Sequence, residues 1–197
     1  IRPAPDTSYK FLAHFDGHAK PRSTLRPVVI GFGPCGIFAA LTLAQMGLRP
    51  IVLERGKSVR ERTQDTWGLW RKKILNPESN VQFGEGGAGT FSDGKLWSQV
   101  KDPKFHWRKV LREFVKSGAP EEILYVSKPH IGTFRLVGVV EKMRKEIIEL
   151  GGEVRFGQKV TGFEIVNHVL HGINLESGEF LEANHVVLAL GHSARDT

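Results

Sequence analysis

Short apolar runs and a helical repeat alternate along the first part of the sequence. Residues 28–30 and 51–53 are continuous apolar runs, and between them apolar residues recur at helical spacing until Gly47. The helical positions are Ile37, Ala40, Leu41 and Ala44. We therefore expect a strand, a tight turn, a helix and a second strand, which a right-handed crossover places side by side in a parallel sheet.

The later part of the chain changes its period twice. Apolar stripes predict helices around residues 107–114 and 136–150. From Glu153 to Glu182 the period becomes two, with a turn at Asn167-His168, which predicts an antiparallel β-meander. Residues 185–190 form an apolar run, as expected of a strand buried on both faces of a sheet. The fold class that we predict is α/β, a Rossmann-like domain with a parallel sheet, helices and an inserted meander.

The sequence Gly31-Phe32-Gly33-Pro34-Cys35-Gly36 lies between the first predicted strand and helix, the position in which a G-x-G-x-x-G motif binds a dinucleotide. The helix start offers free N–H groups and partial positive charge to a diphosphate. Glu54 ends the second strand, where a carboxylate accepts hydrogen bonds from ribose hydroxyls and disfavours a 2′-phosphate. The motif therefore predicts dinucleotide binding.

A second glycine-rich segment, residues 84–96, favours FAD over NAD as the dinucleotide. Its backbone can approach a flat or phosphorylated ligand closely and offer N–H groups along it. Phe83, Phe91 and Leu96 provide apolar anchors that a flexible linker would lack.

These segments together resemble the uncharacterised bacterial FAD-dependent dehydrogenases described as NAD(FAD)-utilising, over about residues 27–197. The resemblance is carried by residues 28–36, 52–56, 86–96, 128–133 and 189–197. More broadly, the chain is similar to the glutathione-reductase-type FAD fold. That resemblance implies that Val160 touches adenine and that Ala189 and Gly191 belong to the second signature of the fold, although Leu190 replaces its usual small residue.

Spacing and resemblance together give one set of expected cofactor-binding residues. They are Gly31, Gly33, Pro34, Cys35, Gly36, Glu54, Arg55, Gly86, Gly87, Ala88, Gly89, Thr90, Asp93, Gly94, Lys95, Leu96, Val160, Ala189 and Gly191. We expect Cys35 to pack within the turn rather than to react. No metal site is expected, because His168 and His171 lie on opposite faces of an alternating strand.

Composition limits the remaining possibilities. The chain has 197 residues, a net charge of +7 and a single cysteine, which excludes a redox-active dithiol within this stretch. No apolar run is long enough to cross a bilayer, so we expect a soluble, cytoplasmic protein. Residues 1–26 read as an extended arm or linker, and residues 27–197 as an FAD-binding domain that is incomplete at its C-terminal end, with the substrate or cap region missing.

The expected function is an FAD-dependent oxidoreductase that transfers hydride or electrons to or from a small molecule, with NADH or NADPH as a candidate donor. Asp93, Lys95, His130 and His192 lie in loops that could approach a flavin, but none is assigned as catalytic. Two alternatives stay open. The basic charge and tryptophans would fit a flavin-dependent RNA-modifying or RNA-binding protein, although no nucleic-acid module is present, and the domain would also fit a non-catalytic FAD-binding module.

Overall fold

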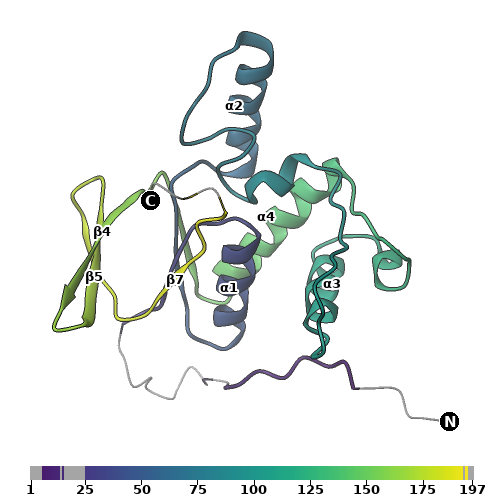
Figure 1. The fold of residues 1–197 in the computed structure, drawn as a ribbon, viewed down its shortest axis with the longest axis horizontal. Coiled ribbons are helices and arrows are strands. Elements are labelled where there is room, and N and C mark those ends of the chain that lie inside the picture. Colours follow the sequence, from purple (N-terminus) through teal and green to yellow (C-terminus); the bar gives the residue numbers. More distant parts are fainter. Residues whose placement is uncertain (1–5, 14, 16–24, 193, 195–197) are drawn as a thin grey trace.

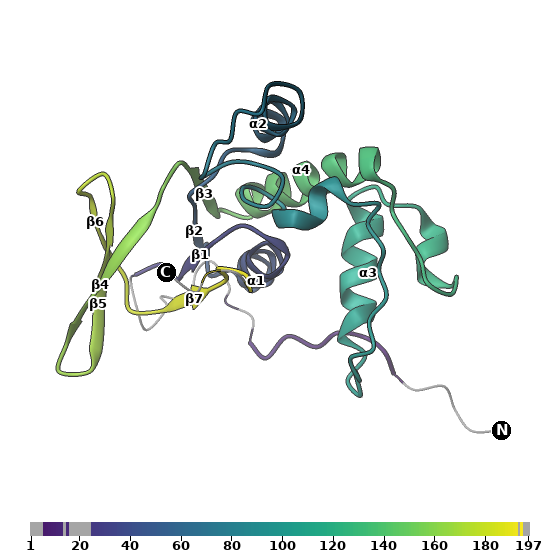
Figure 2. The same cartoon turned by 45° about the horizontal axis from the view of Figure 1, so that its top comes forward.

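A parallel sheet forms the centre of the molecule. The computed structural model describes residues 6–13, 15, 25–192 and 194. The sheet has four strands in the order β3–β2–β1–β7, all parallel. They are β1 (Val28–Ile30), β2 (Ile51–Glu54), β3 (Glu153–Phe156) and β7 (Val186–Leu188), labelled in Figure 2.

Helices and a meander cover opposite faces of this sheet (Figure 2). The helical face carries α1 (Pro34–Gln45) and α4 (Thr133–Glu149). The other face carries an antiparallel sheet of β4 (Val160–Val166), β5 (Val169–Leu175) and β6 (Phe180–Glu182). Figure 1 shows α2 (Val59–Lys72) projecting from one end, and α3 (His106–Lys116) beyond α4. Two short 3-10 turns, Gly87–Phe91 and Glu121–Leu124, complete the fold.

Alternation along β1 produces the two layers of core. Val29 is fully buried among the residues of α1 and α4, whereas Val28 and Ile30 pack with Ile173 and Leu175 of the meander. Burying both faces of a central strand explains why its sequence is a continuous apolar run. The predicted fold class is therefore confirmed, with its parallel sheet, helices and inserted meander.

The structure differs from the sequence prediction at three elements. Residues 153–156 join the parallel sheet beside β2 instead of starting the meander. Strand β7 lies at the sheet edge, where Val186 and Val187 are half-buried against the two cores and Leu188 is 58% exposed, so the expected burial on both faces is met only in part. Helix α2 was not predicted, because its buried face, Val59, Arg62 and Thr66, is mostly polar and gives no apolar stripe.

The N-terminal segment that the sequence predicted as an arm lies partly against α3. The described residues 6–13 and 15 form neither helix nor strand, and they contact α3 through the Tyr9 and His106 rings, whose centroids are 5.9 Å apart. The rest of the predicted arm, apart from Leu25 and Arg26, lies outside the described residues.

Within the described part of the chain, no helix combines the length and hydropathy that a bilayer crossing requires.

Truncating Ile173 tests the packing of the meander on the sheet. Ile173→Ala should lower the free energy of unfolding by about 2–5 kcal/mol, because the fully buried side chain leaves a cavity. Val169→Ala on the same strand should change it by less than about 0.5 kcal/mol, since Val169 is exposed. Urea unfolding measures both, and equal effects at the two positions would contradict this packing.

Candidate dinucleotide-binding site

The first glycine turn lies at the carboxyl end of β1, between β2 and β7. Gly31 N donates to Leu53 O at 2.8 Å, and Ala189 N donates to Ile30 O at 2.8 Å. In the sheet, β1 lies between β2, the next strand in the chain, and β7, a strand from much later in the chain. The strand order therefore reverses at β1. In open α/β sheets, ligands bind in the crevice at such a reversal.

Gly31 and Gly36 are glycines because neighbouring backbone leaves no room for a side chain. Gly31 has φ +97°, and a Cβ atom there would lie 2.5 Å from Ala189 O. A Cβ atom at Gly36 would lie 1.9 Å from Gly31 O. These contacts hold the start of α1 against the ends of β1 and β7, which fixes the shape of the turn.

Gly33 differs from these two, because none of the described residues around it requires a glycine there. Its φ is −76°, an ordinary value, and the nearest atom to a Cβ built on it is Gly87 Cα at 3.9 Å. Within the described part of the chain, the N–H groups of Gly33, Cys35 and Gly36 have no protein acceptor. Open space beside free N–H groups at a helix start fits a diphosphate.

The two residues between Gly33 and Gly36 are both exposed. Pro34 occupies the first helical position, where its missing N–H costs nothing. Cys35 is a free, exposed cysteine at the start of α1, so the expectation that it packs within the turn was wrong.

Glu54 lies directly beside the turn. Its Oε2 accepts from Phe32 N at 2.7 Å and its Oε1 accepts from Gly56 N at 2.8 Å, and the residue is only 5% exposed. A carboxylate has about four lone-pair sites, so two remain for other donors. The structure thus brings together the turn and the acidic residue that the sequence placed at the end of β2.

The second glycine segment packs on the first. Gly86 N donates to Phe32 O at 2.8 Å. A Cβ atom at Gly87 would lie 3.1 Å from Pro34 Cδ and 3.4 Å from Gly33 Cα. Any ligand that occupies the space beside Gly33 therefore also meets the backbone of residues 86–87.

The remaining residues of the second glycine segment point in different directions. Ala88 is exposed and Gly89 half-buried in the 3-10 turn, whereas Thr90 is buried and its hydroxyl donates to Glu85 O at 3.2 Å. Residues 93–96 instead run beside residues 129–132, with Leu96 N donating to Pro129 O and Ile131 N to Gly94 O. Asp93 and Lys95 are exposed and form an ion pair at 3.4 Å, and His130 is exposed beside Lys95.

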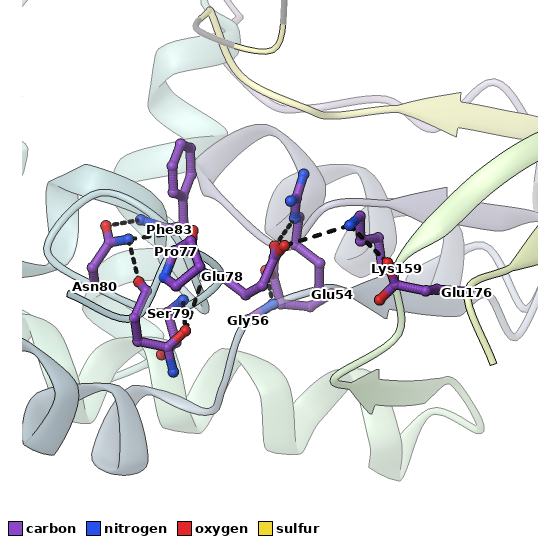
Figure 3. Close-up of polar contacts among 11 residues, drawn as sticks. Glu54, Gly56, Pro77, Glu78, Ser79, Asn80, Phe83, Lys159 and Glu176 are labelled. Carbon is purple, nitrogen blue, oxygen red and sulfur yellow. Dashed lines mark hydrogen bonds and ion pairs between the residues drawn. The ribbon is translucent and has the colours of Figure 1, made fainter. Parts of the chain in front are cut away.

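A charged network borders the carboxyl end of β2, as Figure 3 shows. The Arg55 guanidinium donates to the Glu78 carboxylate and holds the pKa of Glu78 below its usual range. Lys159 lies 2.8 Å from Glu176 and 3.6 Å from Glu78. Val160, which follows Lys159, is half-buried at the start of β4 and packs against the core between the parallel sheet and the meander. Gln158 N donates to Glu54 O at 3.0 Å, which keeps this segment close to β2.

The last predicted residues follow β7. Ala189 is buried and contacts the turn, as described above, whereas Leu190, Gly191 and His192 are exposed. Within the described residues, no group of three or more His, Cys, Asp or Glu side chains is arranged to hold a metal ion. Contact of the predicted residues with a bound cofactor stays a prediction.

Sequence reasoning missed the side chains that hold the second glycine segment in place. Arg62 of α2 and Glu85 are fully buried and hydrogen-bonded around residues 80–86. One signal for α2 was available: Ser58 precedes Glu61 by three residues, the S-x-x-E pattern of helix starts, and their side chains are 2.6 Å apart.

Comparison with known proteins gives relatives that are longer than this chain, and a fold. No family model matches the chain. A protein of Clostridium beijerinckii, described only as an uncharacterized protein, is 53% identical over 172 residues, which are 87% of this chain and 32% of that protein. The dual trans-enoyl reductase/FAD-dependent monooxygenase tazHJ of Aspergillus terreus is 32% identical over 79 residues, 38% of this chain and 11% of that protein. The chain thus spans about a third or less of the curated relatives it matches.

A solved structure supports the fold assignment over almost the whole chain. The 3-ketosteroid-Δ4-(5α)-dehydrogenase of Rhodococcus jostii RHA1 superposes with a TM-score of 0.52 at 14% identity, covering 98% of this chain and 49% of that one. At this identity the similarity concerns the fold alone. The chain has a Rossmann-like α/β fold, which it shares with this dehydrogenase.

Alanine should destabilise the cofactor-free protein much more at Gly36 than at Gly33. Gly36→Ala should destabilise it by about 1–3 kcal/mol or more, because the methyl group meets backbone that cannot yield. Gly33→Ala should cost less than about 1 kcal/mol, since only a preference at the helix cap is lost. Thermal unfolding of both variants tests this difference, and a large loss at Gly33 would mean that the space beside it is filled by protein.

Proposed function

We propose that this chain is the FAD-binding part of an oxidoreductase. The observation that carries the proposal is the open space at Gly33, which is bordered by the N–H groups of the α1 start and by the backbone of Gly87. A diphosphate of a dinucleotide satisfies such N–H groups and needs the close backbone approach that two glycines allow.

Different residues around this space would contact different parts of the cofactor. The N–H groups of Gly33, Cys35 and Gly36 would hold the diphosphate, and Glu54 would accept from the adenosine ribose. Val160 would lie against adenine, beside the end of β2. A 2′-phosphate would meet the Glu54 carboxylate, which favours an unphosphorylated ribose at this position.

FAD is the dinucleotide that the second glycine segment favours. Gly86 and Gly87 contact the first turn through backbone and thereby form a second wall, which a turn motif alone does not provide. The similarity to a relative named as an FAD-dependent monooxygenase and the fold shared with a dehydrogenase are consistent with this choice. We assign the protein to the NAD(FAD)-utilising dehydrogenase family on the segments quoted above.

A bound flavin supplies the hydride or electron transfer, while the protein orients it and excludes water. In this chain the described residues would bind and orient the flavin, and no side chain is assigned to a proton transfer. Because the chain spans 32% of the Clostridium protein, we propose that the substrate and cap region is formed by other parts of a longer polypeptide. The substrate would be a small molecule, and a cytoplasmic location fits the single cysteine.

A second candidate function is a flavin-dependent activity on RNA. Helix α2 exposes Trp67 and Trp70, with the Arg71 guanidinium stacked 3.9 Å from the centre of the Trp67 ring. In single-stranded nucleic-acid sites, bases stack on exposed aromatic rings and cationic side chains follow the phosphate backbone. Binding of transfer RNA that weakens with salt, and that Trp67→Ala reduces, would support this candidate.

Purification of the intact protein should yield bound FAD, seen in its visible spectrum and identified by mass after denaturation. Gly33→Ala should weaken FAD binding about tenfold or more, because the methyl group enters the diphosphate space. Gly68→Ala in α2 is the matched control, since a Cβ there also meets open space, and it should keep FAD. Absence of FAD from the wild-type protein, with no uptake on addition, would contradict the proposal.

A reduced nicotinamide should reduce the bound flavin. Anaerobic addition of NADH or NADPH to the FAD-loaded protein is expected to bleach the visible flavin absorbance, with chemical reduction by dithionite as the control for accessibility. A flavin that dithionite reduces but neither nicotinamide does would contradict the nicotinamide donor. Inertness toward every donor tested would favour a non-catalytic FAD-binding module.

A further inference from the structure

A fully buried arginine lies beneath the second glycine segment. Arg62 of α2 has no exposed surface, and its guanidinium donates to three backbone carbonyls: Asn80 at 2.7 Å, Val81 at 2.8 Å and Glu85 at 2.7 Å. The ring of Phe91, farther along the same segment, lies 4.8 Å from the guanidinium carbon. One side chain thus fixes the backbone of residues 80–85 in three places.

A buried carboxylate fixes the same segment to two helices. Glu85 is also fully buried, and its Oε2 accepts from Val59 N at the start of α2 at 2.7 Å and from Arg144 of α4 at 2.8 Å. Its Oε1 has no partner among the described residues. Arg62, Glu85 and Arg144 are called the loop anchor below.

Stability is a poor explanation for the loop anchor. Burial lowers the pKa of Arg62 to about 10 and raises the pKa of Glu85, so the charged form of each group is disfavoured where it lies. A buried ion pair such as Glu85–Arg144 is often no more stabilising than apolar residues of similar volume. Their geometry, however, restricts a glycine-rich backbone that would otherwise be free. A Cβ at Gly84 would lie 2.7 Å from Arg62 Cδ, so loop and side chain fit closely.

The loop anchor leads directly into the candidate site. Glu85 is followed by Gly86, whose N–H donates to Phe32 O, and by Gly87, which contacts Gly33 and Pro34. We propose that Arg62 and Glu85 are positioning residues that hold the Gly86–Gly87 wall at the distance a diphosphate requires. This proposal rests on the proposed FAD site, and it assigns a role to side chains that no glycine motif includes.

The test compares Arg62→Lys with Arg60→Lys in the intact protein. Lysine keeps the charge but lacks the planar fork that reaches three carbonyls. Arg60 lies on the same helix, is exposed and pairs with Glu141, so its replacement controls for changes on α2. Two readouts are needed: the dissociation constant of FAD, and the rate of amide hydrogen exchange in residues 84–91 of the cofactor-free protein.

Arg62→Lys should raise both the FAD dissociation constant and the exchange rate of residues 84–91 about tenfold or more, because charge-assisted hydrogen bonds are lost. Exchange in β1 and β2 should stay as in the wild type, which a general loss of stability would not allow. Arg60→Lys should leave both readouts within about twofold of the wild type. Unchanged FAD affinity in Arg62→Lys would overturn the proposal.

A second variant decides the matter if Arg62→Lys does not fold. Arg144→Gln removes one partner of Glu85 and leaves Arg62 in place, so it should loosen residues 84–91 and weaken FAD binding while β1 and β2 stay protected. Unchanged FAD affinity in this variant would then overturn the proposal. If the wild-type protein binds no FAD at all, the proposed function fails first, and the exchange rates alone report whether the anchor orders the loop.

Discussion

Close backbone contact at the carboxyl end of β1 is the constraint on which the rest of the structure depends. Gly31 lies against Ala189 of the β7 end, Gly36 lies against Gly31, and Gly56 lies against Gly84. Each contact leaves no room for a side chain, so three segments distant in sequence meet through main chain alone. The N–H groups of the α1 start are thereby left facing an open space rather than a packed core.

The glycine-rich second segment illustrates how such a contact is maintained. Glycine lets the backbone of another segment approach closely, but a glycine-rich segment loses more conformational entropy when the chain folds. Three interactions restrict the backbone of residues 80–87: the hydrogen bonds of the Arg62 guanidinium, those of the Glu85 carboxylate, and the hydrogen bond from Gly86 N to Phe32 O. Flexible composition and fixed position are therefore compatible, because charged side chains supply the constraint.

Charged side chains surround the candidate site in two groups. Glu54 lies beside the turn and accepts two backbone N–H groups, and Arg62 lies close enough to Glu54 for the two charges to interact. Arg55, Glu78 and Lys159 form a separate network at the end of β2. The Glu54 carboxylate and the free N–H groups of the α1 start thus border the same turn, and the proposed dinucleotide site rests on this arrangement.

The sequence by itself determined the elements whose signals are local. The runs at residues 28–30 and 51–53, the turn from Gly31 to Gly36 and the meander hairpin all depend on neighbours within a few residues, and the structure has them. The position of Glu54 beside the turn also follows from the sequence, because it is the last residue of the strand that pairs with β1.

Only the tertiary structure decided which distant segments pair and which polar groups are buried. Residues 153–156 have the alternation of a meander strand, yet they pair with β2, and residues 185–190 have the composition of a central strand, yet β7 lies at the edge. Arg62 and Glu85 look like surface residues in the sequence, and their burial depends on carbonyls and donors brought from elsewhere in the chain. A pattern along the chain records the tendency of each residue toward water, but not the partners that compensate a buried charge.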